Sequence, residues 1–126
     1  MASVIPGGRY ETVLTVLSDT SETTCLTVLD GSLSYYVTEI RAADDGGEAR
    51  TVTLVATING TAYTLVFQGA IATNAPLEYE FKPLVLKYNK ASSTGDTIKA
   101  TASAGGVHVL ITYLDNGRPT TGAGGV

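Results

Sequence analysis

Few side chains in this sequence have the type and spacing that chemistry requires. The 126 residues include one His and one Cys, and they include no Trp. His108 lies in an alternating apolar run without a second His or Cys beside it, so zinc binding or nucleophilic catalysis would need partners that the sequence hardly supplies. Cys25 is flanked by Thr24 and Leu26, which favours a small buried residue over a reactive thiol. We therefore predict no catalytic residue, no cofactor site and no metal site, and a protein that is not an enzyme.

Acidic residues form two groups that could bind or react. The turn Asp44-Asp45-Gly46-Gly47-Glu48 could hold calcium, because hard cations favour clustered carboxylate oxygens, but it lacks the alternating ligand spacing of a dedicated loop. A solvated hairpin turn is the favoured interpretation, and cation binding stays open. Glu78 and Glu80 lie two residues apart on one strand face and could form the carboxylate pair of a glycosidase. Two acids in this arrangement are more commonly the solvent side of a strand.

Tyrosines are the remaining candidates for binding. A platform of aromatic rings could stack on sugars, but the case is weak without Trp, and Tyr is also common wherever one end of a side chain is buried and the other is wet. A carbohydrate- or receptor-binding module is therefore the alternative hypothesis. The tyrosines that could in part line such a platform are Tyr35, Tyr36, Tyr63, Tyr79, Tyr88 and Tyr113.

Charge and hydropathy argue against two classes of partner. The formal net charge is −4, and the 8 basic residues are scattered without the one-sided basic stripe that phosphate backbones require, so we expect no direct nucleic-acid ligand. The first residues lack the pattern of a signal peptide, and no segment approaches the length of apolar chain that spans a bilayer. We expect synthesis in a cytoplasm and no membrane partner.

The elements that must carry these residues are short strands, because Thr alternates with apolar residues along most of the chain. The cleanest segment runs from Arg50 to Gln68. Val52, Leu54, Ala56 and Ile58 alternate with polar residues before Asn59-Gly60, and Tyr63, Leu65 and Phe67 alternate after it. Asn-Gly suits a type I′ turn because both central residues need positive φ, so this segment predicts a two-residue hairpin.

Other segments have the same alternation. The phase of the apolar residues shifts near Thr38-Glu39, which predicts a β-bulge, and Pro83 places its strand at a sheet edge or corner. Lys90 to Asp96 is expected to be a polar loop without periodicity. The further strand candidates are residues 10–17, 23–29, 34–43, 77–81, 84–86, 97–103 and 107–114.

About eight or nine strands with turns roughly every eight to twelve residues predict an all-β fold, a two-sheet antiparallel β-sandwich of jelly-roll or immunoglobulin-like strand order. We expect an N-terminal arm at residues 1–9, the sandwich at 10–115 and a Gly-rich C-terminal tail at 116–126. Tails of this composition fray in an isolated domain, so we expect these extended termini to lie on a neighbouring subunit.

The last strand candidate has apolar residues on both faces. Val107, Val109, Ile111 and Tyr113 form the expected core side, which places His108, Leu110 and Leu114 on the other side. If Leu110 and Leu114 face outward, this strand presents apolar surface that a neighbouring subunit would cover.

Three segments together resemble small β-sandwich structural proteins of tailed-bacteriophage virions. In that group a Gly-Asp-Thr-Ile turn precedes a strand of small residues and a final Val-rich strand, as it does here in 94–103 and 107–113 after 81–86. The upstream segments 37–43 and 50–54 also resemble the group's pattern. The loop 88–94 is longer than the usual tight turn before Gly-Asp, which leaves the role of this loop open.

This resemblance implies a non-enzymatic virion protein, most of all a capsid decoration or cement protein that stabilises the head by bridging capsid subunits. A head–tail or tail accessory protein is the second alternative that it leaves open. The implied partners are the major capsid protein or another virion protein, together with further copies of the chain, a trimer being favoured. The implied localisation is the virion, after synthesis in the cytoplasm of a bacterial host.

Overall fold

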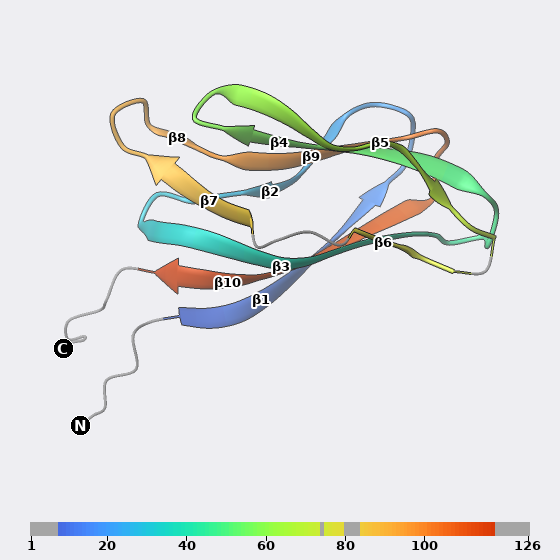
Figure 1. Cartoon of the computed structure of the whole chain (residues 1–126), viewed down its shortest axis with the longest axis horizontal. Coiled ribbons are helices and arrows are strands. Elements are labelled where there is room, and N and C mark those ends of the chain that lie inside the picture. Colours follow the sequence, from blue (N-terminus) through green and yellow to red (C-terminus); the bar gives the residue numbers. More distant parts are fainter. Residues whose placement is uncertain (1–7, 74, 80–83, 118–126) are drawn as a thin grey trace.

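The chain folds as a sandwich of two antiparallel β-sheets, as predicted (Figure 1). The computed structural model describes residues 8–73, 75–79 and 84–117, and within these ranges it contains ten strands and no helix. The strands are β1 (Gly8–Leu17), β2 (Thr23–Thr27), β3 (Ser32–Asp44), β4 (Arg50–Ile58), β5 (Thr61–Ile71), β6 (Leu77–Tyr79), β7 (Leu84–Asn89), β8 (Thr94–Gly95), β9 (Thr97–Ala102) and β10 (Val107–Gly117).

The strand order selects the jelly roll from the two predicted alternatives. The larger sheet has the order β1-β10-β3-β7-β8, with β6 also paired to β3, and the smaller sheet has the order β2-β9-β4-β5. When the short β6 and β8 are left out, β1 pairs with β10, β2 with β9, β3 with β7 and β4 with β5. The first strand thus pairs with the last and the second with the second-last, down to the β4–β5 hairpin in the middle of the chain. This is the rolled-up hairpin of a jelly roll, and it differs from the order of immunoglobulin domains.

The core between the sheets is built from one face of each strand. In β4 and β9 buried and partly exposed residues alternate along the strand, and in β10 they alternate from Val107 to Ile111, as the sequence predicted. Tyr35 also lies in this core, 3% exposed, with its ring stacked on Tyr113 at a centroid distance of 4.5 Å. The largest fully buried side chains are Leu17, Ile40, Leu54, Ile71, Leu86, Ile98 and Ile111.

Two local predictions are confirmed by the backbone. Asn59 and Gly60 have φ of 51° and 83° and form the two-residue turn between β4 and β5. The register of β3 on β10 shifts at Thr38, where Glu39 and Val37 pair with successive residues, and Thr38 Oγ1 donates to the carbonyl oxygen of Thr112 at 3.2 Å. The bulge therefore lies where the apolar phase shifts.

The regular alternation expected in β5 is wrong. The pairing of β5 with β4 shifts register on both sides of Leu54, and Gln68 has a φ of 48°. Beyond these shifts Phe67 is 73% exposed, although it continued the apolar pattern of the hairpin. Tyr63 lies before the shifts and pairs with the buried Ala56, yet on this edge strand it is 56% exposed.

The expectation of a featureless loop at residues 90–96 is also wrong at its end. Thr94–Gly95 forms β8 against β7, and Asp96 is buried, with only 8% of its surface exposed. Its Oδ1 accepts the backbone N–H of Asn59 at 2.9 Å, and its Oδ2 accepts that of Lys87 at 2.9 Å. A Cβ on Gly95 would overlap the carbonyl oxygen of Val28, so Gly is required there.

The backbone of Asp96 adds two more bonds. Its N–H donates to the Lys87 carbonyl at 2.9 Å, and its carbonyl accepts the N–H of Val28 at 3.0 Å. The Gly-Asp-Thr-Ile turn thus joins β7 of the larger sheet to the β4–β5 turn of the smaller sheet and to the end of β2.

The expected termini fall partly inside the sheets. Gly8 and Arg9 belong to β1, opposite Asn116 and Asp115 of β10, and Gly117 ends β10. The rest of the predicted arm and tail, residues 1–7 and 118–126, lies outside the described residues, as do Phe81 and Pro83.

Replacing Asp96 by Ala should lower the free energy of unfolding by about 2–4 kcal/mol, because the backbone N–H groups of Asn59 and Lys87 lose their charged acceptor. Asp96→Asn, which keeps one carbonyl oxygen, should cost less. Urea unfolding followed by circular dichroism measures both. Asp30→Ala is the control, since Asp30 is 66% exposed and lies 3.9 Å from Lys90; a surface pair of this kind contributes less than about 1 kcal/mol. Equal losses at Asp96 and Asp30 would contradict the structural role of the turn.

Candidate functional site

His108 is a partly exposed strand residue that lies beside one carboxylate. It sits on the outer face of the larger sheet, between Val16 of β1 and Ala43 of β3, and is partly exposed as predicted. Its Nε2 lies 3.7 Å from Oδ2 of Asp45. Among residues 8–73, 75–79 and 84–117 no three His, Cys, Asp or Glu side chains come together as metal ligands would.

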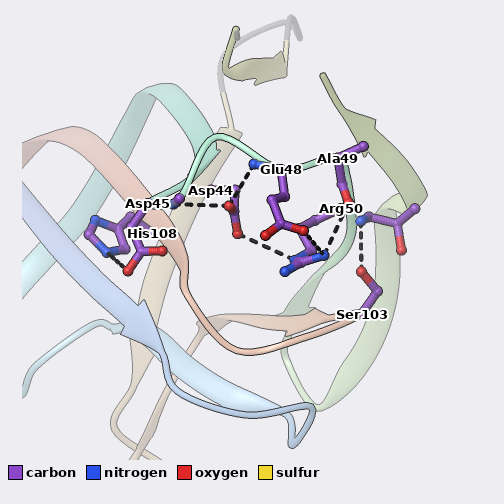
Figure 2. Close-up of polar contacts among 9 residues, drawn as sticks. Asp44, Asp45, Glu48, Ala49, Arg50, Ser103 and His108 are labelled. Atoms are coloured by element: carbon purple, nitrogen blue, oxygen red, sulfur yellow. Dashed lines mark hydrogen bonds and ion pairs between the residues drawn. The ribbon is translucent and has the colours of Figure 1, made fainter. Parts of the chain in front are cut away.

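The acidic turn uses its carboxylates to hold its own shape (Figure 2). Asp44 Oδ2 accepts the backbone N–H groups of Gly46 at 3.0 Å and Glu48 at 2.9 Å. Arg50 lies between the acids, with Nε 3.4 Å from Asp44 Oδ1 and Nη1 3.5 Å from Glu48 Oε1. The N–H of Glu48 first, and then that of Gly46 and the Arg50 charge, lower the pKa of Asp44 against an opposing effect of burial. A cation here would compete with a guanidinium already in place, so the geometry favours the structural interpretation of this turn.

The other candidates for chemistry are also separated. Glu78 of β6 lies 3.2 Å from Nη2 of Arg41, a cation on the neighbouring strand, and Glu80 falls outside the described residues. Cys25 is buried, as predicted, and this burial raises the pKa of its thiol to about 11. A thiol with so high a pKa is almost entirely protonated at neutral pH and reacts slowly.

The tyrosines do not form one platform. Tyr35 and Tyr113 face the core, Tyr36 lies on the outer face of the larger sheet, and Tyr63 lies on the edge strand of the smaller sheet. Tyr79 and Tyr88 pack partly buried against the core. Burial first, and then the neighbouring Tyr35, raise the pKa of Tyr113.

The feature that stands out is the outer face of the larger sheet. Its apolar side chains, which we call the apolar face, are Tyr10, Leu14, Val16, Tyr36, Val85, Leu110 and Leu114. Four of them are at least two-fifths exposed: Tyr10 at 66%, Leu14 at 56%, Val16 at 52% and Val85 at 41%. Leu110 and Leu114 lie on this face, which confirms the outward orientation that the sequence suggested for them.

Register aligns these side chains into rows across the sheet. One row is apolar on four successive strands, because Tyr10 of β1 pairs with Leu114, Leu114 with Tyr36 of β3, and Tyr36 with Val85 of β7. A second row joins Leu14 to Leu110 and then to Arg41, whose charge is met by Glu78 and Glu39. Between the second row and Pro76 lies an open, largely apolar hollow of about 290 Å³.

The outer face of the smaller sheet has the opposite character. Outward residues of its strands are mostly threonines, among them Thr53, Thr57, Thr64 and Thr101, with Lys99 beside Val55. Both sheets have one face in the common core, so this difference lies in the faces that point away from it. Water can solvate the hydroxyls of the smaller sheet, whereas the apolar face leaves hydrocarbon in contact with water.

Sequence reasoning missed the part of the apolar face that β1 contributes. Tyr10, Leu14 and Val16 share one parity of that strand, while Val13 and Leu17 share the other and face the core. Apolar residues on both parities of a strand in an antiparallel sandwich are the signal that could have identified it, because such strands ordinarily keep one polar face.

No protein-family model matches the chain, and no curated protein sequence matches it. Among solved structures, it is similar to the protein of a virus-like particle of extra small virus from the giant freshwater prawn Macrobrachium rosenbergii, determined by cryo-EM. The match has 19% sequence identity and a TM-score of 0.37, and it covers 90% of this chain and 83% of that chain. With a TM-score this low, the jelly-roll assignment stands on the strand order alone.

The lowered pKa of Asp44 predicts how stability depends on acid. A carboxyl group with a depressed folded-state pKa stabilises the fold above its ordinary pKa, and this contribution is lost as pH falls toward the folded value. Asp44→Asn should therefore lower the melting temperature at pH 7 and flatten its decline below about pH 4. Asp45→Asn, which changes an exposed carboxyl in the same turn, is the control. An unchanged acid profile in Asp44→Asn would contradict the assignment.

Proposed function

We propose that this chain is a non-enzymatic structural protein of a virion and that the apolar face binds other virion subunits. The observation that carries the proposal is the row Tyr10–Leu114–Tyr36–Val85, which is apolar across four adjacent strands on a surface that faces away from the core. A flat row of this kind suits a rigid platform that binds by excluding water from another protein surface.

Charge compensation within the apolar face is compatible with binding there. Each Å² of apolar surface removed from water contributes about 25 cal/mol, and a stable specific contact covers about 800 Å² on each partner. Arg41 lies inside the face, but Glu39 and Glu78 neutralise it at 3.7 Å and 3.2 Å. An incoming apolar surface would therefore meet a compensated charge at Arg41.

The specific role we propose is that of a decoration or cement protein that bridges subunits of the major capsid protein. The resemblance to tailed-phage virion proteins supports this role, and its Gly-Asp-Thr-Ile motif coincides with the turn of Gly95 and Asp96. The jelly roll is compatible with the proposal but does not select it, because viral capsid proteins and lectins both use this fold.

A carbohydrate- or receptor-binding role is the second candidate, favoured by one observation. A hollow of about 400 Å³ lies between the β4–β5 turn and β7, and Asn59, Tyr88, Asn89 and Lys90 are among the residues that line it. Amide groups can form hydrogen bonds with sugar hydroxyls, and a neighbouring aromatic ring can stack on the sugar. Asn89→Ala would weaken binding to a glycan array if this candidate were right and would leave assembly into particles unchanged if the first were right.

Purified virus particles from the source of this gene should contain the chain in a fixed ratio to the major capsid protein. Val85→Glu should lower that ratio at least about tenfold, because it would bury an unpaired carboxylate in the contact. Thr64→Glu on the smaller sheet's edge strand should leave it unchanged. Quantitative mass spectrometry of gradient-purified particles measures the ratio. Equal incorporation of both variants would exclude the apolar face, and absence of the wild-type chain from particles would exclude the virion role.

A further inference from the structure

We infer that two copies of this chain pair through the free edge of β1, antiparallel to each other, so that their larger sheets continue across a twofold axis. The inference goes beyond the proposed function, because it concerns the edge of the sheet and a second copy of the same chain. It holds whether or not the apolar face binds a virion.

The edges of the two sheets differ in how well they are protected from pairing with another chain. A free edge offers unpaired N–H and C=O groups to another chain, and proteins protect such edges with short strands, bulges, Pro, Lys or covering side chains. Edge strand β2 has five residues and a register shift between Thr24 and Leu26. Edge strand β5 is interrupted by two register shifts and by the positive φ of Gln68. Both edges of the smaller sheet are therefore protected.

The larger sheet is protected on one side only. At its β7 side, β8 has two residues, and Asp96 covers Lys87 with bonds to both its N–H and its carbonyl. On the opposite side, β1 has ten residues and pairs with β10 from Gly8 to Leu17 without a register shift. β1 contains no Pro, Lys or bulge, and no strand within the described ranges pairs with its other side. Among the described strands it is the long, regular edge (Figure 1, blue).

The side chains of β1 favour a second copy over a charged partner. Its two charged residues, Arg9 and Glu11, form an ion pair with each other at 2.7 Å, so the strand has no net charge that would repel an identical strand. Its outward apolar residues Tyr10, Leu14 and Val16 are each more than half exposed. Hydrophobic cross-strand pairs with a neighbouring strand would cover part of them.

The register of the pair follows from the two faces. If the apolar faces of both copies are to lie on the same side, residues of equal parity must be opposite each other. The twofold axis then passes midway between the two copies of one β1 residue. An axis at Glu11 would place the two Glu11 carboxylates opposite each other, which is unfavourable. An axis at Thr12 instead places Tyr10 opposite Leu14 of the partner subunit and Glu11 opposite Val13 of the partner subunit.

With the axis at Thr12, almost the whole of β1 takes part in the pairing. Residues 8 to 16 all find partners, which provides about nine main-chain hydrogen bonds. Thr12 already lies 3.3 Å from Thr112 between the hydroxyl oxygens, and this row would continue through Thr12 and Thr112 of the second copy. The contact is isologous, so it closes as a dimer, in place of the trimer that the resemblance implied.

A cysteine at the twofold axis tests this register. In Thr12→Cys the two new thiols would face each other, and oxidised glutathione should convert them to a disulfide while it is reduced to two glutathione molecules. Thr64→Cys, on the outer face of β5, should give no covalent dimer, and Cys25 should give no background because burial raises its pKa to about 11. Non-reducing gel electrophoresis measures the products. Equal yields of covalent dimer from both variants, or none from Thr12→Cys, would overturn the pairing.

A charge on the edge provides the second test. Leu14→Lys should weaken dimerisation at least about tenfold, because an inserted Lys protects a natural edge from pairing. Thr64→Lys is the matched control, and analytical ultracentrifugation measures both dissociation constants. A wild-type protein that stays monomeric at about 100 μM, or a dimer that Leu14→Lys leaves unchanged, would refute the inference. If the wild-type chain were monomeric and still incorporated into particles, the proposed dimer would be excluded and the proposed virion role would be retained.

Discussion

The interaction on which the arrangement depends is the pair of hydrogen bonds accepted by the buried Asp96 carboxylate. The apolar core holds the sheets together, but apolar contacts are non-directional and do not fix how one layer is placed on the other. Asp96 adds direction, because its two oxygens bind N–H groups of the β4–β5 turn and of β7, which belong to different sheets. Together with the backbone bond to Val28, these contacts fix the position of one sheet relative to the other at one end of the sandwich.

The second constraint is the difference between the two outer faces. Both arise from the same alternation of residues along strands, yet one presents hydroxyls and the other presents a row of Tyr, Leu and Val side chains. Exposed apolar rows of this extent are stabilised when another surface covers them. The proposed assembly role and the proposed β1 dimer use adjacent parts of the larger sheet, and pairing through β1 would join two apolar faces into one continuous surface.

Much of the local structure was predictable, because it depends on neighbouring residues only. Asn59-Gly60 permits positive φ at both positions, so the hairpin follows from two residues. Side chains of successive strand residues point to opposite faces, so one extra residue moves all the following side chains to the other face. The phase shift near Thr38 therefore predicts a bulge. The alternation in β9 predicts its buried side for the same reason. Strand β5 departs from the expected alternation where its register against β4 shifts. These shifts depend on both strands, so the sequence of β5 alone does not predict them.

By itself the sequence determined the class of fold, the period of two in the strands, the buried Cys25 and the scarcity of reactive side chains. Only the tertiary structure decided the jelly-roll order, the burial of Asp96 and the row of apolar residues from Tyr10 to Val85. The physical reason is the same for all three. Strand pairing brings together residues far apart in the chain, such as Tyr10 and Leu114, and local periodicity carries no record of which strand lies beside which.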